Sequence, residues 1–267
     1  MMTAFWSIQH GQACTTSNTA AVACMSAILK KGKLLAAHTH ISRSPLEKCL
    51  FPSRELAGHD SGDFANHGLD ALLRLSRSGR LSSGMVPDYT WSLLRENRLD
   101  VLPGTQRPSR VDGPDTDQIL QVFQAAVRHY GHVMVDVHSG LEVEGTLDIL
   151  TAADRLMVCL NQNSHMLESW FSDRNTRSKL ENHSACFLIS RYDRDVGLTP
   201  ANIARKYGVP RTRVLPVPYS AALMHACNQG NLYDFLARHA ADVKSPERDL
   251  MDSLKEVVEL LNEGGES

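Results

Sequence analysis

Short apolar runs recur along the 267-residue chain, separated by longer stretches in which apolar residues return every three or four positions. The runs are expected to be β-strands, and they lie at residues 3–8, 33–37, 98–103, 133–137, 156–160, 186–189 and 214–218. Several of them are apolar throughout, which is typical of central strands in a parallel sheet because both faces are buried. Prolines in the last run favour an edge or an end of the sheet.

Helical spacing is found between these runs. The expected helices cover residues 18–30, 69–75, 117–130, 164–171, 202–208, 232–239 and 246–262. Residues 43–66 are polar and contain prolines and glycines, so they are expected to be irregular. Strands that alternate with helices predict an α/β fold of three layers, with a mostly parallel sheet between two layers of helices. No internal repeat or linker interrupts the pattern, and residues 1–267 are expected to form a single domain.

Composition places the chain among ordinary globular proteins. It is 42% hydrophobic and 22% charged with a net charge of −2, which argues against collagen-like, disordered and coiled-coil classes. No apolar run approaches the roughly 18 residues that a membrane span needs. The first nine residues lack the basic and long apolar segments of a signal peptide. Six cysteines without a CxxC pair favour a reducing compartment, so a cytoplasmic location is expected.

The loop after the first expected strand has features of an anion-binding loop, although taken alone it is a weak signal. It reads HGQACTTS from position 10 to position 17. Small residues let backbone N–H groups close around an anion, and a following helix N-terminus favours negative charge. A hydroxyl at the start of that helix can also bind Mg²⁺. The alternative is an ordinary helix with Thr15, Thr16 or Ser17 as its N-cap.

The motifs along the chain resemble those of the ParA/MinD family of deviant P-loop ATPases. The loop at 10–17 is similar to the family's Lys-Gly-Gly-x-Gly-Lys-Thr-Thr motif, and the apolar run that ends in Asp136 resembles its Walker B strand. Segments 99–105, 153–160 and 189–218 resemble further strands and turns in the same order, so the likeness is nearly full length. The resemblance implies a P-loop NTPase-like sheet in a dimerising nucleotide switch that positions plasmids, division sites, flagella or pili.

The resemblance also implies a site for ATP or ADP with Mg²⁺. The implied cofactor-binding residues come from the loop and from three later strands, and they are Gly11, Gln12, Ala13, Cys14, Thr15, Thr16, Ser17, Asp136, Arg191 and Pro218. Thr16 and Asp136 stand at the family's Mg²⁺-binding positions. Arg191 and Pro218 lie on the two late strands that hold the base in the family.

Four positions depart from the family's pattern. The two loop lysines are replaced by His10 and Thr15, and the third loop glycine by Cys14. The aspartate that polarises the attacking water is replaced by His38. Phosphoryl transfer depends on positioned positive charge and a positioned water, so we expect weak or no ATP hydrolysis and assign no catalytic residue. The TadZ/CpaE-like branch, which positions pili, also tolerates a degraded loop, and the chain could lie near it.

Histidines follow several expected strands, where side chains of neighbouring strands meet. His10 follows the first strand, His38 and His40 follow the second, and His138 comes two residues after Asp136. His38, His40 and His138 could bind a transition metal, since imidazole is a common ligand of such ions. They could instead contact phosphate, or be unrelated polar residues at a rim rich in loops. No transition metal is expected.

The sequence therefore predicts a ParA/MinD-like partition, positioning or assembly factor with a degenerate nucleotide site. We expect a homodimer that works with a protein partner. One alternative is an active ATPase of plasmid or chromosome partition or of pilus or flagellum placement, and another is a dimeric scaffold that no longer binds nucleotide. Basic clusters at 74–80, 107–110 and 205–213 leave DNA binding open, with a solvated surface as the favoured interpretation. The last expected helix is mostly acidic outside its apolar positions, so no direct membrane anchor is expected.

Overall fold

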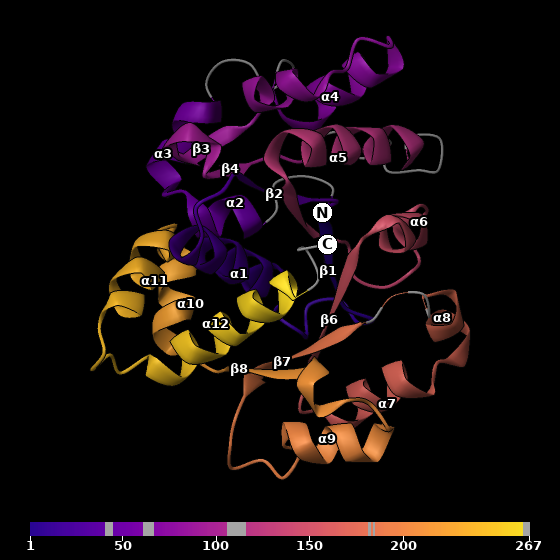
Figure 1. Ribbon diagram of the computed structural model, residues 1–267, viewed down its shortest axis with the longest axis vertical. Helices are drawn as coiled ribbons and strands as arrows, with labels where there is room; N and C mark the ends of the chain where they lie inside the picture. The colour runs from indigo at the N-terminus through magenta and orange to yellow at the C-terminus, as the bar shows by residue number, and fades with distance from the viewer. Residues whose placement is uncertain (41–44, 61–66, 106–115, 181–182, 184, 264–267) are drawn as a thin grey trace.

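The computed structural model describes the chain except for residues 41–44, 61–66, 106–115, 181–182, 184 and 264–267 (Figure 1). Within the described residues, an eight-stranded sheet has the strand order β3-β4-β2-β5-β1-β6-β7-β8. The strands are β1 (Met2–Trp6), β2 (Leu34–His38), β3 (Trp91–Leu94), β4 (Leu99–Val101), β5 (His132–Asp136), β6 (Arg155–Asn161), β7 (Cys186–Tyr192) and β8 (Val214–Pro218). The sheet is parallel apart from β3, which pairs antiparallel with β4.

The positions of the strands follow the hydrophobic pattern. β1 lies at the centre between β5 and β6, and all five of its residues are buried. β8 lies at an edge, as its prolines favoured, because proline cannot donate a backbone hydrogen bond to a further strand. β3 forms the other edge and was not predicted. It has only four residues, WSLL, which are too few for a strand period to be distinguished from a helical one.

Helices cover both faces of the sheet, which confirms the predicted three-layer α/β fold. They are α1 (Thr15–Leu29), α2 (Pro45–Leu50), α3 (Ser53–Asp60), α4 (Gly68–Arg77), α5 (Thr116–Tyr130), α6 (Thr146–Ala152), α7 (Ser164–Ser172), α8 (Arg174–Lys179), α9 (Pro200–Tyr207), α10 (Ala221–Gln229), α11 (Leu232–Ala241) and α12 (Arg248–Asn262). In Figure 1, α1 and α10–α12 gather on one face, and α5–α8 lie on the other. None of the helices in the described residues is long and apolar enough to cross a lipid bilayer.

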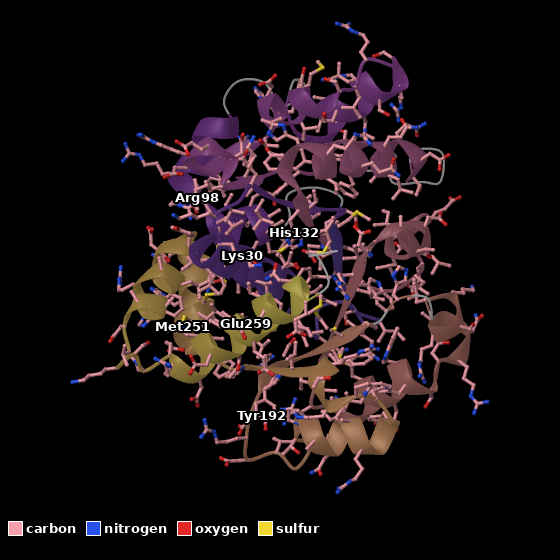
Figure 2. The ribbon with its side chains drawn as sticks, viewed as in Figure 1. Lys30, Arg98, His132, Tyr192, Met251 and Glu259 are labelled. Carbon is pink, nitrogen blue, oxygen red and sulfur yellow. The ribbon has the colours of Figure 1, made fainter. Side chains whose placement is uncertain are left out.

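Helix α1 is buried over most of its length because other helices cover the side that faces away from the sheet. It packs against α2, α11 and α12 as well as against β1, β2 and β5. Its centre consists of small side chains, including Ala20, Ala23 and Cys24, which are fully buried. Met251 of α12, labelled in Figure 2, is also fully buried. Small residues let neighbouring helices approach closely, so the loop before α1 is attached to a tightly packed helix.

The expectation of an irregular segment at 43–66 was wrong for residues 45–60. Helix α2 begins at Pro45 and buries Leu46, Cys49 and Leu50, which share one helical face. Proline is favoured in the first turn of a helix, so its presence marked a helix start and not an interruption. Residues 43–44 and 61–66 lie outside the described residues. Helices α6, α8 and α10 were also not predicted, because they are short.

Two glycines that end helices allow a matched stability test. Gly208 and Gly230 both have φ of +67° and cap α9 and α10 in the left-handed region. A Cβ at Gly208 would meet no atom within 4 Å, whereas a Cβ at Gly230 would lie 2.6 Å from the backbone nitrogen of Pro52 and closer still to Phe51. Gly208→Ala is expected to lower the free energy of unfolding by about 1 kcal/mol, the cost of a left-handed alanine. Gly230→Ala is expected to cost about 1–3 kcal/mol more, because backbone atoms must move.

Urea unfolding of both variants measures this difference. Equal losses of unfolding free energy in the two variants would show that Phe51 and Pro52 can move away from Gly230 without a cost in stability.

Candidate functional site

The loop between β1 and α1 lies at the carboxyl end of the central strand. Gly11 has φ of +73° and Cys14 has φ of +51°, so the loop turns twice through the left-handed region. Helix α1 begins at Thr15, about one turn earlier than expected, with Cys14 as its N-cap. The alternative in which Thr15, Thr16 or Ser17 is the N-cap is therefore wrong. Cys14 makes no side-chain capping bond, and the first-turn N–H groups of α1 can receive an anion.

Polar side chains of the sheet and of α1 hold the loop, and two of them, Asn18 and Ser190, are buried. Ser190 Oγ of β7 donates to the carbonyl of Ala13 at 2.7 Å, and Asn18 Nδ2 donates to Ser190 Oγ at 2.7 Å. Asn161 Nδ2 donates to the carbonyl of Gln12 at 3.1 Å. Gly11 and Gln12 remain exposed. Because these bonds use carbonyl groups of the loop, they fix its shape without consuming its N–H groups.

Thr16 and Asp136, the two residues at the implied Mg²⁺ positions, are in contact. Thr16 Oγ1 donates to Asp136 Oδ2 at 2.6 Å. Asp136 ends β5 and is fully buried, and its Oδ1 has no hydrogen-bond partner within the described residues. A buried carboxylate oxygen without a partner is rare in proteins. Together with the hydroxyl it is a donor set that suits Mg²⁺, which prefers oxygen ligands and retains several waters.

Four histidines form a row beside this pair. The ring centroids of His10 and His138 are 5.6 Å apart, those of His138 and His40 are 5.5 Å apart, and those of His40 and His38 are 5.8 Å apart. His40 Nε2 also lies 3.1 Å from Asp136 Oδ2. Burial lowers the pKa of His138, and the neighbouring His40 and His10 lower it further. The lowered pKa favours the uncharged form of the His138 side chain.

His38 forms a buried ion pair with a residue that sequence analysis missed. His38 Nε2 lies 2.8 Å from Glu47 Oε1, and both side chains are almost completely buried. Burial lowers the pKa of His38, but the carboxylate of Glu47 outweighs this effect and the pKa is raised. Burial likewise opposes the charged form of Glu47, but the imidazolium and its hydrogen bond lower the pKa of that carboxyl. Glu47 lies on α2, in the segment that was expected to be irregular, so no sequence signal pointed to it.

The three histidines considered for a transition metal have other partners. His38 pairs with Glu47, His40 faces Asp136, and His138 Nδ1 lies 2.8 Å from the carbonyl of Ser139. Within the part of the chain that the structure describes, no group of three or more His, Cys, Asp or Glu side chains is arranged to hold a metal ion. The geometry therefore does not favour the transition-metal hypothesis.

Arg191 and Pro218 lie together at the carboxyl ends of β7 and β8. The pairing of these strands is irregular between Ser190 and Tyr192, and Arg191 there has φ of +52°. The Arg191 guanidinium lies 5.7 Å from the centre of the exposed Tyr219 ring. Burial raises the pKa of the Cys14 thiol, and the positive charge of Arg191 partly opposes this. Arg191 is thus close enough for its charge to reach the loop.

The basic clusters have varied surroundings. Arg74 and Arg77 lie on α4, and Lys206 of α9 pairs with Glu168 at 3.1 Å on an exposed surface. Exposed pairs of this kind contribute little to stability. Arg107 and Arg110 lie outside the described residues.

No protein-family model and no curated protein sequence matches the chain. Solved structures do match. A ParA family ATPase from Chlorobium tepidum TLS superposes with a TM-score of 0.73 at 16% identity, over 97% of each chain. The MinC:MinD cell division complex of Aquifex aeolicus superposes with a TM-score of 0.71 at 14% identity, over 100% of this chain and 96% of that one. MinD of Pyrococcus horikoshii OT3, complexed with Mg-ADP, superposes with a TM-score of 0.69 at 14% identity, over 100% of this chain and 98% of that one. The chain therefore has the ParA/MinD-like P-loop NTPase fold.

Proposed function

We propose that this protein is a ParA/MinD-like partition, positioning or assembly factor that binds ATP or ADP with Mg²⁺ weakly and hydrolyses little or no ATP. One observation carries the proposal. The Thr16 hydroxyl and the buried Asp136 carboxylate meet at the uncapped start of α1, directly after a loop that contains no lysine. The site has oxygen ligands for Mg²⁺ and N–H donors for phosphate, but it lacks the loop cations.

Different groups of the described residues would bind the phosphates, the Mg²⁺ ion and the base. N–H groups of the loop and of the first turn of α1 would receive phosphate oxygens. Thr16 and Asp136 would hold Mg²⁺, which neutralises phosphate charge when it is bound. Arg191 and Pro218 would contact the base, since they lie at the carboxyl ends of β7 and β8, the two strands that resemble the base-holding strands of the family. Cys14 has the positive φ that glycine usually supplies, so this loop shape does not require a glycine there.

The geometry also supports slow hydrolysis. The position at which the resemblance implies a water-polarising aspartate is occupied by His38, whose side chain is completely buried against Glu47. In that position it cannot contact an attacking water. The loop offers Thr15 where a lysine would neutralise phosphate charge. Removing positioned charge from a phosphoryl-transfer site raises the barrier, since catalysis there is mainly positioning and electrostatic stabilisation.

We further propose a cytoplasmic homodimer that acts with a protein partner. Solved structures of this fold include a MinC:MinD complex and a putative plasmid partition protein of Borrelia burgdorferi B31, which supports a positioning or partition role. A direct membrane anchor is not proposed, because the apolar face of α12 packs inside the protein, with Leu254 and Val257 fully buried. Its exposed face is mainly acidic, which anionic lipids would repel.

Calorimetry with ATP, with and without Mg²⁺, tests the proposal directly. We expect weak binding that Mg²⁺ strengthens, together with ATP turnover far below that of a ParA or MinD protein measured in parallel. Turnover equal to those proteins would favour the active ATPase. No binding under either condition would favour the scaffold that has lost nucleotide binding. Light scattering with and without ATP reports whether a homodimer forms.

Restoring a loop cation is expected to strengthen nucleotide binding. Thr15 occupies the position of a family lysine, and Thr15→Lys would add a charged donor near the phosphates. Hydrogen bonds to charged groups contribute about 1.5–3 kcal/mol, so affinity for ATP should rise about tenfold or more. Thr15→Met is the matched control, because it adds similar length without charge. Equal affinity of both variants for ATP would argue that phosphate does not lie beside position 15.

A further inference from the structure

A second site lies away from the nucleotide loop. A cavity of about 430 Å³ opens at the amino ends of β7 and β8, between α7, α8 and the turn that precedes β8. Its walls include Trp170, Arg174, Arg177, His183, Phe187 and Arg213. The nucleotide loop, by contrast, lies at the carboxyl ends of the strands, and the two sites share no residue. Cavities of several hundred Å³ are typical of small-molecule sites.

Among the described residues, the charged side chains that line this cavity are all arginines. Arg174, Arg177 and Arg213 line it, and no carboxylate belongs to its walls within the described residues. Arg177 is held in place, since it donates to the carbonyl of Phe171 at 2.8 Å and lies 5.9 Å from that residue's ring centre. Within the described part of the chain, no ion pair engages Arg174 or Arg213. Three arginines without acidic partners create a positive potential that attracts anions.

Two further nitrogen-bearing side chains, Trp170 and His183, belong to the walls of the cavity. Trp170 is 2% exposed, and its indole Nε1–H has no hydrogen-bond partner among the described residues. His183 Nε2 lies 3.1 Å from the carbonyl of Thr151, so this nitrogen also acts as a donor. The indole N–H of Trp170 has almost no accessible surface, so it lies behind the wall of the cavity and does not face the open space. The guanidinium groups of Arg174, Arg177 and Arg213 are the donors in the cavity wall, and they fit a ligand with several acceptor oxygens.

We propose that this cavity binds a small organic phosphate. Arg174 and Arg213 would hold the phosphate, because a guanidinium pairs with two phosphate oxygens at once. Phe187 and the other apolar walls would cover the organic part of the ligand. A duplex nucleic acid presents its phosphates on a convex surface and cannot enter such a concavity. This inference goes beyond the proposed nucleotide function and does not depend on it.

Calorimetry without Mg²⁺, with glucose 6-phosphate and pyrophosphate as probes, tests this site on the full chain. We expect Arg174→Gln and Arg213→Gln each to weaken binding about tenfold or more, as expected for loss of a charge-assisted hydrogen bond. Arg205→Gln is the matched control, since Arg205 lies exposed on α9 outside the cavity and bonds to Asn202. Its affinity should match that of the wild type. Trp170 fluorescence should change on binding, and Trp170→Phe should abolish that change.

Three results would overturn the proposal. One is equal affinity of the wild type, Arg174→Gln and Arg213→Gln for both probes. A second is binding that is lost on Thr16→Val, because the probes would then occupy the nucleotide loop. The third is binding of duplex DNA without binding of either small phosphate, which would make the arginines a nucleic-acid contact. Circular dichroism of each variant verifies that it has folded.

Discussion

Replacing Glu47 by alanine is expected to lower the free energy of unfolding by about 3–5 kcal/mol. Glu47 and His38 are both almost completely buried and lie 2.8 Å apart, so removal of the carboxylate leaves an imidazole without its partner in the interior. Glu47 Oε1 also accepts a hydrogen bond from the backbone N–H of Gly104 at 3.3 Å, which would lose its acceptor. Chemical denaturation measures the loss. Glu55→Ala on α3 is the matched control, because Glu55 is exposed and its removal should change stability by no more than about 0.5 kcal/mol.

The cost of Glu47→Ala is expected to depend on pH with a defined sign. The pKa of His38 is raised, so its share of the stability is complete below the ordinary histidine pKa and is lost as pH rises through the raised value. The pKa of Glu47 is lowered, so its share is present above the ordinary glutamate pKa and is lost as pH falls through the lowered value. The difference between wild type and variant should therefore shrink as the pH rises above the ordinary histidine pKa. A constant difference above that pKa would mean that His38 is not charged in the folded protein.

Replacing Asp136 by asparagine is expected to abolish the Mg²⁺-dependent part of nucleotide binding. Residues that only orient a metal ligand contribute about 10- to 100-fold to metal affinity, so loss of a direct ligand should cost about 100-fold or more. Asparagine keeps an acceptor for the Thr16 hydroxyl, whose bond to Asp136 is 2.6 Å long. It also removes a buried charge with one oxygen lacking a partner, so the ligand-free protein should be no less stable than wild type.

Calorimetry with ATP at several Mg²⁺ concentrations measures the first effect, and thermal unfolding without ligand measures the second. Asp148→Asn on α6 is the matched control, since Asp148 is exposed and far along the chain from the loop. If Mg²⁺ strengthens ATP binding by Asp136→Asn as much as it does for the wild type, the ion does not bind at Asp136. A marked loss of stability without ligand would mean that Asp136 is mainly structural.

The two residues replaced in these predictions, Glu47 and Asp136, are connected through His38 and His40. Helix α2 brings Glu47 beneath His38, and His38 lies next to His40, which faces Asp136. The row therefore connects a structural ion pair to the candidate Mg²⁺ ligand. Since Glu47→Ala acts on stability and Asp136→Asn on binding, the two variants separate these roles.

The sequence by itself determined seven of the eight strands, the edge position of β8 and the place of the loop, whereas β3 was not predicted. Strands buried on both faces are apolar apart from their end residues, as β5 and β6 are, and this pattern is local in the chain. Asp136 was singled out because the apolar run that ends in it resembles the Walker B strand of the ParA/MinD family. The loop at 10–17 was found because its small residues precede a helix, although α1 starts one turn earlier than its apolar pattern indicated.

Only the tertiary structure decided which polar groups meet and which lack partners. Residues 43–66 appeared irregular because α2 and α3 are short, and the ion pair of Glu47 with His38 depends on how α2 packs against the sheet. Among the described residues, Asp136 Oδ1 and the indole N–H of Trp170 have no hydrogen-bond partner, and this depends on all the segments packed around each of them. The arginines of the cavity come from α8 and from the turn before β8, which are distant in sequence. Hydrophobic periodicity follows from which face a segment buries, whereas polar contacts depend on the packing of several segments at once.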